Sequence, residues 1–181
     1  MELRDATPDD AAAIVAIYNH YVTTTAISFE EDTVSADAMR ERIANVQESD
    51  LPWLVATIDG KVAGYAYATK WRVRHAYRFS VESSVYIGRD QAGHGLGTAL
   101  YAALIERLKW SGHHLVIGGI ALPNDASVRL HEKMGFVKVA HFTEVGRKFE
   151  RWIDVGYWQL TILVKDCGTT VPLRQCSAVT A

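Results

Sequence analysis

Three glycines alternate where a strand-like segment meets the start of a long amphipathic helix, and this junction constrains the fold most. The apolar segment Val85-Tyr86-Ile87 leads through Gly93-His94-Gly95-Leu96-Gly97 into a helix that we expect to run from about Leu96 to Ser111. Glycine lets a ligand approach the main chain closely, and a helix N-terminus adds unpaired N–H groups and partial positive charge. The junction therefore fits a phosphate or pyrophosphate site and, on the glycines alone, equally a flexible turn.

Two common phosphate loops do not fit this junction. A Walker loop needs Gly-Lys-Ser/Thr, whereas Thr98 and Ala99 follow Gly97. A dinucleotide fingerprint needs Gly-x-Gly-x-x-Gly near the start of a βαβ unit. Here the spacing is Gly-x-Gly-x-Gly, and the loop lies mid-chain, after a hairpin turn predicted at Asp59-Gly60.

The periodicity of the apolar residues predicts the element order βααβββαβαββ. Thr7-Pro8, Ser35 and Asn124 indicate helix starts, and Gly112 and Gly135 indicate helix ends. This order predicts an α/β domain with a mixed central sheet of about seven strands flanked by helices. The expected strands are 2–6, 53–58, 61–71, 79–87, 114–122, 136–145 and 155–163.

The composition argues against several classes of protein. The 181 residues fit one domain, and a net charge of −2 gives no strong field for nucleic acid or an anionic membrane. No apolar run approaches the ~20 residues that span a bilayer. Both cysteines, Cys167 and Cys176, lie close to the C-terminus, so we expect no cysteine-based metal site and no metal. We expect a single domain over residues 1–165, a poorly ordered tail over 166–181 and, without a visible secretory signal, a cytoplasmic location.

The glycine loop resembles motif A of the GNAT superfamily of N-acetyltransferases, Gln/Arg-x-x-Gly-x-Gly/Ala, which holds the pyrophosphate of coenzyme A. Gly95-Leu96-Gly97 fits the second half of the motif, but the Gln/Arg position falls on Ala92. Either the neighbouring Gln91 compensates or the grip rests on backbone amides, and we favour the amides. The resemblance implies acetyl-CoA as co-substrate, with contacts from Val85, Tyr86, Ile87, Gly93, His94, Gly95, Leu96, Gly97, Thr98 and Asn124.

Further segments, between about residues 2 and 163, resemble the phosphinothricin N-acetyltransferase group, which includes acetylases of methionine sulfone and methionine sulfoximine. The resemblance implies the GNAT fold, in which two parallel strands splay apart to form the coenzyme A groove. It also implies a homodimer, a small amino-acid-like substrate, and the amide of Val85 or Tyr86 as a donor to the thioester carbonyl. The matching segments are 17–21, 28–30, 79–87, 122–132, 145–149 and 152–155.

Glu82 is the first candidate catalytic residue, because an acid inside a strand rich in Val, Tyr and Phe is costly unless it is paired or functional. It can be a strand-edge carboxylate that pairs with Arg72, Arg74 or Arg78. It can also be a general base, directly or through water, since a partly buried glutamate has a raised pKa. The family resemblance points to Glu82 as the base.

His131 and Asn124 lie on the helix that follows the next predicted strand. Many GNAT enzymes have a tyrosine at the position of His131, near the coenzyme sulfur, and the phosphinothricin group has histidine there. The resemblance implies a role at the acetyl or sulfur end, as acid, base or orienting group, whereas the residue alone fits a hydrogen-bonded helix histidine. Asn124 is a suitable helix N-cap, and the resemblance adds a contact to the pantetheine arm.

Basic and aromatic residues alternate over residues 70–79. Such a run can be a nucleic-acid patch, which the overall charge disfavours, or a solvated edge. We predict an anion pocket, since arginine binds carboxylate, sulfone or phosphinate groups in a forked geometry. Arg72 and Arg74 would share one face if this segment is extended, and Phe29 and Tyr77 could form apolar walls.

The sequence therefore predicts acetyl transfer from acetyl-CoA to the amino group of a small amino acid or analogue. Glu82 would assist deprotonation, and His131 would assist at the sulfur. The alternatives are acetylation of a peptide or protein N-terminus and, less in keeping with the presence of both Glu82 and His131, a non-enzymatic domain that senses acyl-CoA.

Overall fold

The computed structural model describes residues 1–91 and 94–162. Gly93 and Ala92 of the glycine loop and the predicted tail, 166–181, lie outside the described residues. The described residues contain one seven-stranded mixed sheet in the order β1-β2-β3-β4-β5-β7-β6. Its strands are β1 Glu2–Asp5, β2 Trp53–Ile58, β3 Lys61–Lys70, β4 Ser80–Ile87, β5 Leu115–Leu122, β6 Val137–Lys148 and β7 Arg151–Thr161.

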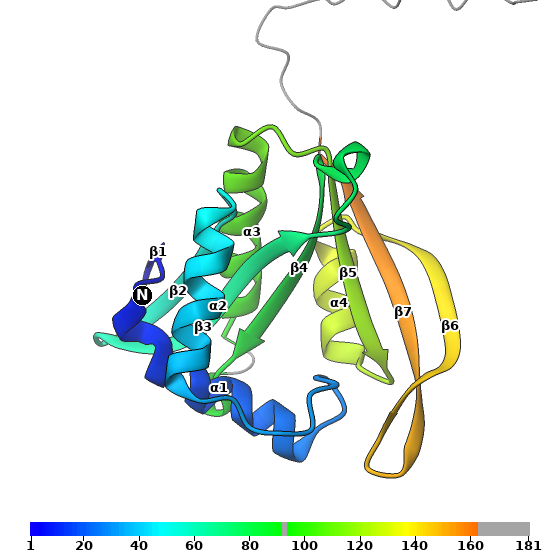
Figure 1. Cartoon of the computed structure of the whole chain (residues 1–181), viewed down its shortest axis with the longest axis horizontal. Helices are drawn as coiled ribbons and strands as arrows, with labels where there is room; N and C mark the ends of the chain where they lie inside the picture. The colour runs from blue at the N-terminus through cyan, green and yellow to red at the C-terminus, as the bar shows by residue number, and fades with distance from the viewer. Residues whose placement is uncertain (92–93, 163–181) are drawn as a thin grey trace, which may run out of the picture.

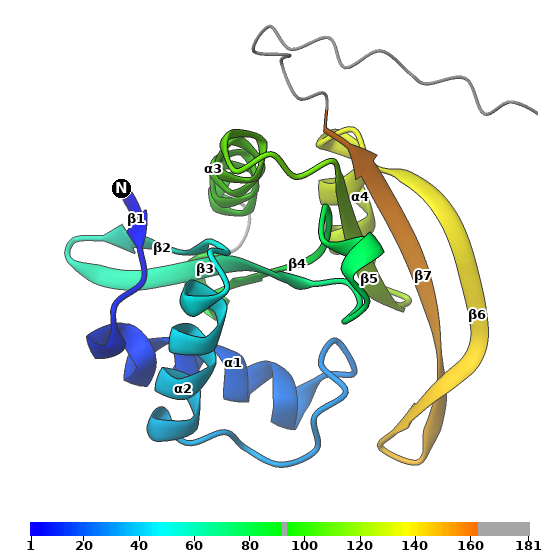
Figure 2. The same cartoon turned by 45° about the horizontal axis from the view of Figure 1, so that its top comes forward.

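Helices cover both faces of the sheet, as the sequence predicts. The helices are α1 Ala11–Thr24, α2 Ala36–Glu48, α3 Leu96–Trp110 and α4 Asp125–Lys133. Figure 2 shows α1 and α2 on one face and α3 on the other, and α4 packs against β5 on the α3 side. The predicted element order and mixed sheet are confirmed. Among the described residues, no helix is long and apolar enough to span a membrane.

The predicted helix starts and apolar stripes are also confirmed. The Ser35 hydroxyl accepts a hydrogen bond from the Ala38 N–H at the start of α2, and Met39, Ile43 and Val46 of this helix are buried. The buried side chains of α3 include leucines 96, 100, 104 and 108, spaced one helical turn apart.

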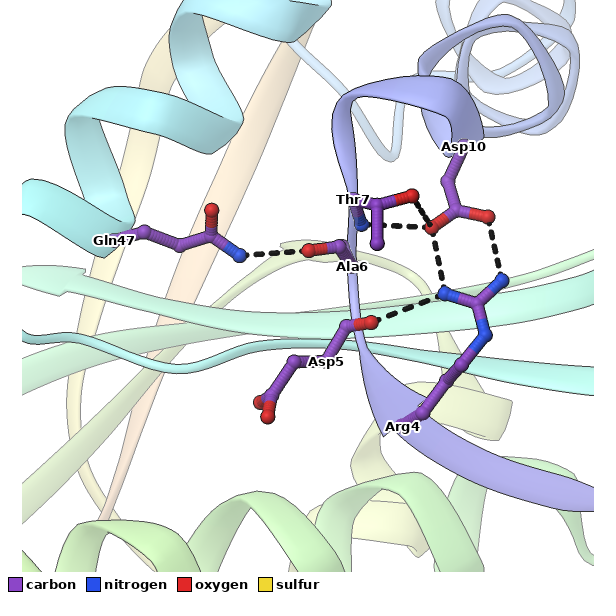
Figure 3. A network of polar contacts seen from close by, with 6 residues as sticks. All are labelled: Arg4, Asp5, Ala6, Thr7, Asp10 and Gln47. Carbon is purple, nitrogen blue, oxygen red and sulfur yellow. Dashed lines mark hydrogen bonds and ion pairs between the residues drawn. The ribbon is translucent and has the colours of Figure 1, made fainter.

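A polar network ties the start of α1 to the first strand and to α2 (Figure 3). Arg4 donates to both carboxylate oxygens of Asp10, at 2.7 and 2.8 Å, and the Thr7 N–H donates to the same carboxylate. The Arg4 guanidinium holds the pKa of Asp10 at about 2, against the effect of burial. Gln47 of α2 donates to the Ala6 carbonyl at 2.8 Å. This network fixes the α1–α2 layer at the edge of the sheet away from β5.

Several predicted strand ends differ from the structure. The predicted segments 136–145 and 155–163 are in fact one long hairpin, β6 and β7, joined at Phe149 and Glu150, whose φ angles are 50° and 59°. Hairpin turns with positive φ are usually marked by Gly, Asn or Asp, so Phe-Glu carries no turn signal. The strand predicted over 61–71 ends at Lys70, and residues 71–79 form a loop that contains the 3-10 turn His75–Tyr77.

The splay between two parallel strands is present. β4 and β5 pair only through Ser80–Leu115, Val81–Val116 and Glu82–Ile117, although both strands continue for five more residues. In Figure 1 they start together at the top and diverge downward, with α4 behind them. The sheet is therefore open between β4 and β5 from Ser83 onward.

Candidate active site

Three neighbouring cavities follow one another through the splay, from one face of the sheet to the other. A groove of about 420 Å³ lies beside the start of α3, a slot of about 50 Å³ lies between β4 and β5, and a cleft of about 490 Å³ lies on the α1 face. The groove and the slot share Val85 and Asn124, and the slot and the cleft share Tyr86 and Gly119. Ile27 borders all three. The cavities therefore form one path from the glycine loop to the opposite face of the sheet.

The glycine loop presents main-chain groups to the groove. Gly95 has φ +77° at the position before α3, a conformation that other residues rarely adopt. The first N–H groups of α3, at Leu96, Gly97 and Thr98, are those that a helix leaves without an internal acceptor. The Leu96 side chain is buried in the core, whereas His94 is exposed. Gly95 to Thr98 line the groove, and the predicted contact Gly93 lies outside the described residues.

Lys133 supplies a positive charge beside this loop, which the sequence analysis missed. Its Nζ donates to Thr98 Oγ1 at 3.4 Å, and both residues line the groove with Gln91. The resemblance to motif A places Ala92 where a cation or amide is usual, and Lys133 brings an ammonium to the same helix N-terminus from α4. The only sequence signal was its place two residues after His131.

The segment Val85-Tyr86-Ile87 borders the path on the β4 side. Val85 and Ile87 line the groove, and Tyr86 lines the slot and the cleft. On its other edge the segment pairs with β3, from Ala66 to Gly64. The Tyr21 hydroxyl donates to the Ile87 carbonyl at 2.7 Å, so α1 fixes the end of β4 next to the glycine loop.

Asn124 caps α4 and borders the path on the β5 side. Its Oδ1 accepts a hydrogen bond from the Ser127 N–H at 3.1 Å, as expected of an N-cap. Because the oxygen is used in capping, the side-chain amide N–H groups are the donors that Asn124 can offer to a ligand.

Glu82 lies at the floor of the cleft, on the α1 face of β4. A Cβ placed on Gly119 would lie 3.2 Å from Glu82 Oε1 and 3.2 Å from Tyr157 Cε1, so the carboxylate rests over the glycine backbone of β5. Burial raises the pKa of Glu82, and the positive charge of Arg72 partly opposes this shift. Among the described residues, no salt bridge within 4 Å includes Glu82. The ion pair with Arg72, Arg74 or Arg78 that the sequence left open is not formed.

His131 lies on the other face of the sheet, in a buried chain of hydrogen bonds. Its Nδ1 lies 2.8 Å from the Ser127 carbonyl and its Nε2 lies 2.8 Å from the Tyr101 hydroxyl, which in turn lies 2.7 Å from Ser83 Oγ. A carbonyl only accepts, so Nδ1 carries the proton, and the neutral ring accepts from Tyr101 at Nε2. Burial lowers the pKa of His131, which favours this neutral form.

The same chain sits where β4 and β5 separate. Ser83, the first residue beyond the paired part of β4, has its Oγ 3.3 Å from the Ile117 carbonyl of β5. The His131 ring packs against Gly118, because a Cβ there would lie 2.6 Å from His131 Cδ2. The imidazole therefore occupies the space beside the β5 backbone at the point where strand pairing stops.

The predicted substrate residues are only partly brought together. Phe29 lines the cleft, and Arg72 lies near enough to influence the charge of Glu82 while its guanidinium stacks on Trp71 at 4.1 Å. The extended segment that would align Arg72 with Arg74 is absent, because residues 71–79 form a loop. Arg72, Arg74 and Tyr77 are all exposed, and none of them is among the described residues that line the cleft.

The described part of the chain contains no group of three or more His, Cys, Asp or Glu side chains placed to hold a metal ion.

Comparison with known proteins finds relatives that share the sequence and the fold. A model of the acetyltransferase (GNAT) domain matches residues 3–156. A phosphinothricin N-acetyltransferase of Streptomyces viridochromogenes is 40% identical over 180 residues, covering 99% of this chain and 95% of the relative. An L-methionine sulfoximine/L-methionine sulfone acetyltransferase of Salmonella typhimurium is 39% identical, covering 90% and 95%.

Two solved structures share the fold along most of their length. A Salmonella typhimurium protein described as a putative acetyltransferase with its cofactor acetyl-CoA has a TM-score of 0.88 at 37% identity, covering 93% of this chain and 96% of that chain. A ribosomal-protein-alanine N-acetyltransferase of Brucella melitensis has a TM-score of 0.88 at 35% identity, covering 90% and 100%.

Proposed function

The chain belongs to the GNAT acetyltransferase family, and on this premise we propose that it transfers an acetyl group from acetyl-CoA to the amino group of a small amino acid or analogue. Phosphinothricin, methionine sulfone and methionine sulfoximine are the analogues that its relatives suggest. One observation carries the proposal. A half-buried carboxylate with a raised pKa, Glu82, lies at the end of a path that passes through the splay to the glycine loop.

The groove and slot offer hydrogen-bond donors that suit acetyl-CoA. The main chain of Val85 to Ile87, the N–H groups from His94 to Thr98, and the Asn124 amide would hold it, with Lys133 near the phosphates. Gly93 is part of the same proposal. Bound there, the co-substrate supplies an acetyl group activated as a thioester. The amide of Val85 or Tyr86 is the proposed donor to the carbonyl oxygen as its negative charge grows.

Glu82 is the proposed general base. A substrate ammonium must lose a proton before its nitrogen can attack, and a carboxylate at the cleft floor accepts that proton directly or through one water. The raised pKa brings Glu82 closer to the operating pH, which makes it a better-matched base than an exposed glutamate.

The cleft suits a small substrate that carries an anionic group. Phe29, Tyr18 and Tyr157 supply aromatic walls beside Glu82, and Arg72 supplies the nearby positive charge. Arg72 is the proposed partner of a carboxylate, sulfone or phosphinate. Arg74 and Tyr77 stay predictions: like Arg72 they are exposed in the loop 71–79, but only the charge of Arg72 acts on Glu82 among these three residues.

We also propose a homodimer. Apolar side chains are exposed along the edge strand β6, including Val137, Val139 and Phe142, and an exposed apolar patch of this kind marks an association surface. Light scattering after size-exclusion chromatography would show a mass near 40 kDa, twice the chain mass of 20.1 kDa; a 20.1 kDa peak would contradict the dimer. The cytoplasmic location and the lack of nucleic-acid and membrane partners stay predictions.

Acetylation of a protein N-terminus is a second candidate, favoured by the similarity to the Brucella melitensis alanine N-acetyltransferase. A thiol-release assay would compare free amino acids, methionine sulfone, methionine sulfoximine, phosphinothricin and an alanine-starting peptide. We expect turnover with one or more of the small substrates and little with the peptide. Turnover with the peptide alone would establish the second candidate, and acetyl-CoA binding without turnover would indicate a sensor.

A further inference from the structure

Lys148 is a buried lysine whose ammonium donates hydrogen bonds to two main-chain oxygens. The residue is 2% exposed, and its Nζ donates to the Val22 carbonyl at 2.7 Å and to the Ser28 carbonyl at 2.6 Å. Among the described residues, no carboxylate lies within salt-bridge distance of it. Burying an ammonium without an ion-pair partner is costly, and burial accordingly lowers the pKa of Lys148, although the more distant charges of Glu31 and Glu30 partly oppose this shift. A position that bears this cost is a candidate for a specific role.

The two carbonyls belong to one structural unit. Val22 lies in the last turn of α1, where carbonyls lack helical partners and the helix dipole is negative. Ser28 lies in the connection between α1 and α2, 120 residues before Lys148. The Ser28 side chain also lies 2.9 Å from the Tyr18 hydroxyl. Lys148, on β6, therefore joins the far hairpin to the end of α1 and to the connection that follows.

A second contact joins the same connection to β6. The Phe29 ring packs directly on Gly146, because a Cβ on Gly146 would lie 2.5 Å from Phe29 Cζ. Arg42 of α2 holds the next residue, Glu30, through a forked ion pair. The segment Ile27–Glu30 is therefore held at both its main chain and its side chains.

This segment forms one wall of the cleft that contains Glu82. All four of its residues line that cleft, whereas of the four only Ile27 lines the groove beside the glycine loop. A shift of the segment would change the space opposite Glu82 and leave the donors at the start of α3 in place.

We propose that Lys148 is a positioning residue for the amino substrate: its two hydrogen bonds hold the wall Ile27–Glu30 at the distance from Glu82 that the substrate requires. The proposal rests on the proposed function. It concerns only the binding of the amine, so an experiment can distinguish it from an effect on acetyl-CoA binding.

The test compares Lys148→Met with Lys138→Met, an exposed lysine on the same strand. For Lys148→Met we expect the KM of the best amine in the panel to rise by about tenfold or more, because small displacements at a reacting site are costly. The Kd of acetyl-CoA, measured by calorimetry, should stay within about twofold of the wild-type value. A general loss of structure would instead weaken the binding of both ligands. Lys138→Met should match the wild type.

Gly146→Ala provides a second variant that leaves the buried ammonium intact. The added methyl displaces Phe29, whose ring is 42% exposed and can move outward without opening the core. It should also raise the amine KM and leave the acetyl-CoA Kd unchanged. If Lys148→Met fails to fold, this variant still tests whether the position of the wall sets the amine KM.

The outcomes are distinct. If the wild type transfers acetyl to no amine, the proposed function fails first. If the wild type is active and Lys148→Met keeps its amine KM, or loses acetyl-CoA affinity equally, the positioning role of Lys148 is wrong. If only Gly146→Ala can be measured and its amine KM is unchanged, the role is also wrong.

Discussion

Replacing Gly118 with alanine should destabilise the protein through His131, on the face of β5 away from Glu82. The new Cβ would lie 2.6 Å from His131 Cδ2, whereas ordinary contacts lie at 3.4–4 Å, so the ring must move by about an ångström to restore normal contact. The ring is 4% exposed, and overpacking a core of this kind costs about 1–3 kcal/mol.

The displaced ring also loses its bond to Tyr101. Leaving buried polar groups unpaired costs about 1–3 kcal/mol, and the alanine returns about 0.4–1 kcal/mol by restricting the unfolded chain. The net loss is about 1–5.6 kcal/mol, which corresponds to a melting temperature lower by roughly 2–22 °C for a chain of this length.

Gly119→Ala is the matched control, because the next residue points to the opposite face. Its Cβ would lie 3.2 Å from both Glu82 Oε1 and Tyr157 Cε1, and both of these side chains line the open cleft. The free energy of unfolding should therefore change by less than about 1 kcal/mol, while kcat/KM falls. Melting curves followed by circular dichroism decide the question. If Gly118→Ala melts within about 2 °C of the wild type, or if Gly119→Ala is the less stable of the two, the packing of His131 against β5 does not stabilise the fold as proposed.

Three further predictions concern the site. Glu82→Gln should lower kcat/KM by about 10²–10⁴-fold. It should also abolish the acid limb of the pH profile, because wild-type activity falls as the pH drops through the raised pKa of Glu82. A Gln variant with full activity over pH 6–9 would refute the base assignment. Arg72→Ala removes the charge that holds the pKa of Glu82 down, so the limb should move to higher pH, and a limb that stays in place would show that Arg72 does not act on Glu82. Lys133→Met should raise the acetyl-CoA Kd by about fivefold, a loss of about 1 kcal/mol that is typical of an exposed ion pair. The rise in Kd should be smaller at high salt, which screens the charge. Calorimetry at two salt concentrations tests this, and an unchanged Kd would refute the role of Lys133.

Local patterns in the sequence were sufficient to predict the fold. The periodicity that places Met39, Ile43 and Val46 inward on α2 depends only on residues within that helix, and the structure follows it. Ser35 and Asn124 cap their helices through atoms three residues away. The hairpin turn at Phe149-Glu150 was not predicted, because both residues have positive φ but neither is of a type that normally signals such a turn.

The candidate site was less predictable, because its supporting contacts join residues far apart in sequence. Lys148 reaches Ser28 across 120 residues, and Lys133 reaches Thr98 across 35. Nothing local to either lysine distinguishes it from a solvated one. Arg74 was placed on the assumption that residues 71–79 are extended, an assumption that the 3-10 turn there removes.

The environments of Glu82 and His131 separate their roles. Burial raises the pKa of the first and lowers the pKa of the second, so each is pushed toward its neutral form. Glu82 lines the cleft, whereas His131 lines the slot between β4 and β5. The single N–H of neutral His131 is used by the Ser127 carbonyl, and its other nitrogen accepts from Tyr101. His131 in this state has no proton to give to a leaving thiolate. We therefore propose that Glu82 carries the proton transfer and that His131, with Tyr101 and Ser83, holds β4 and β5 apart so that the path to Glu82 stays open.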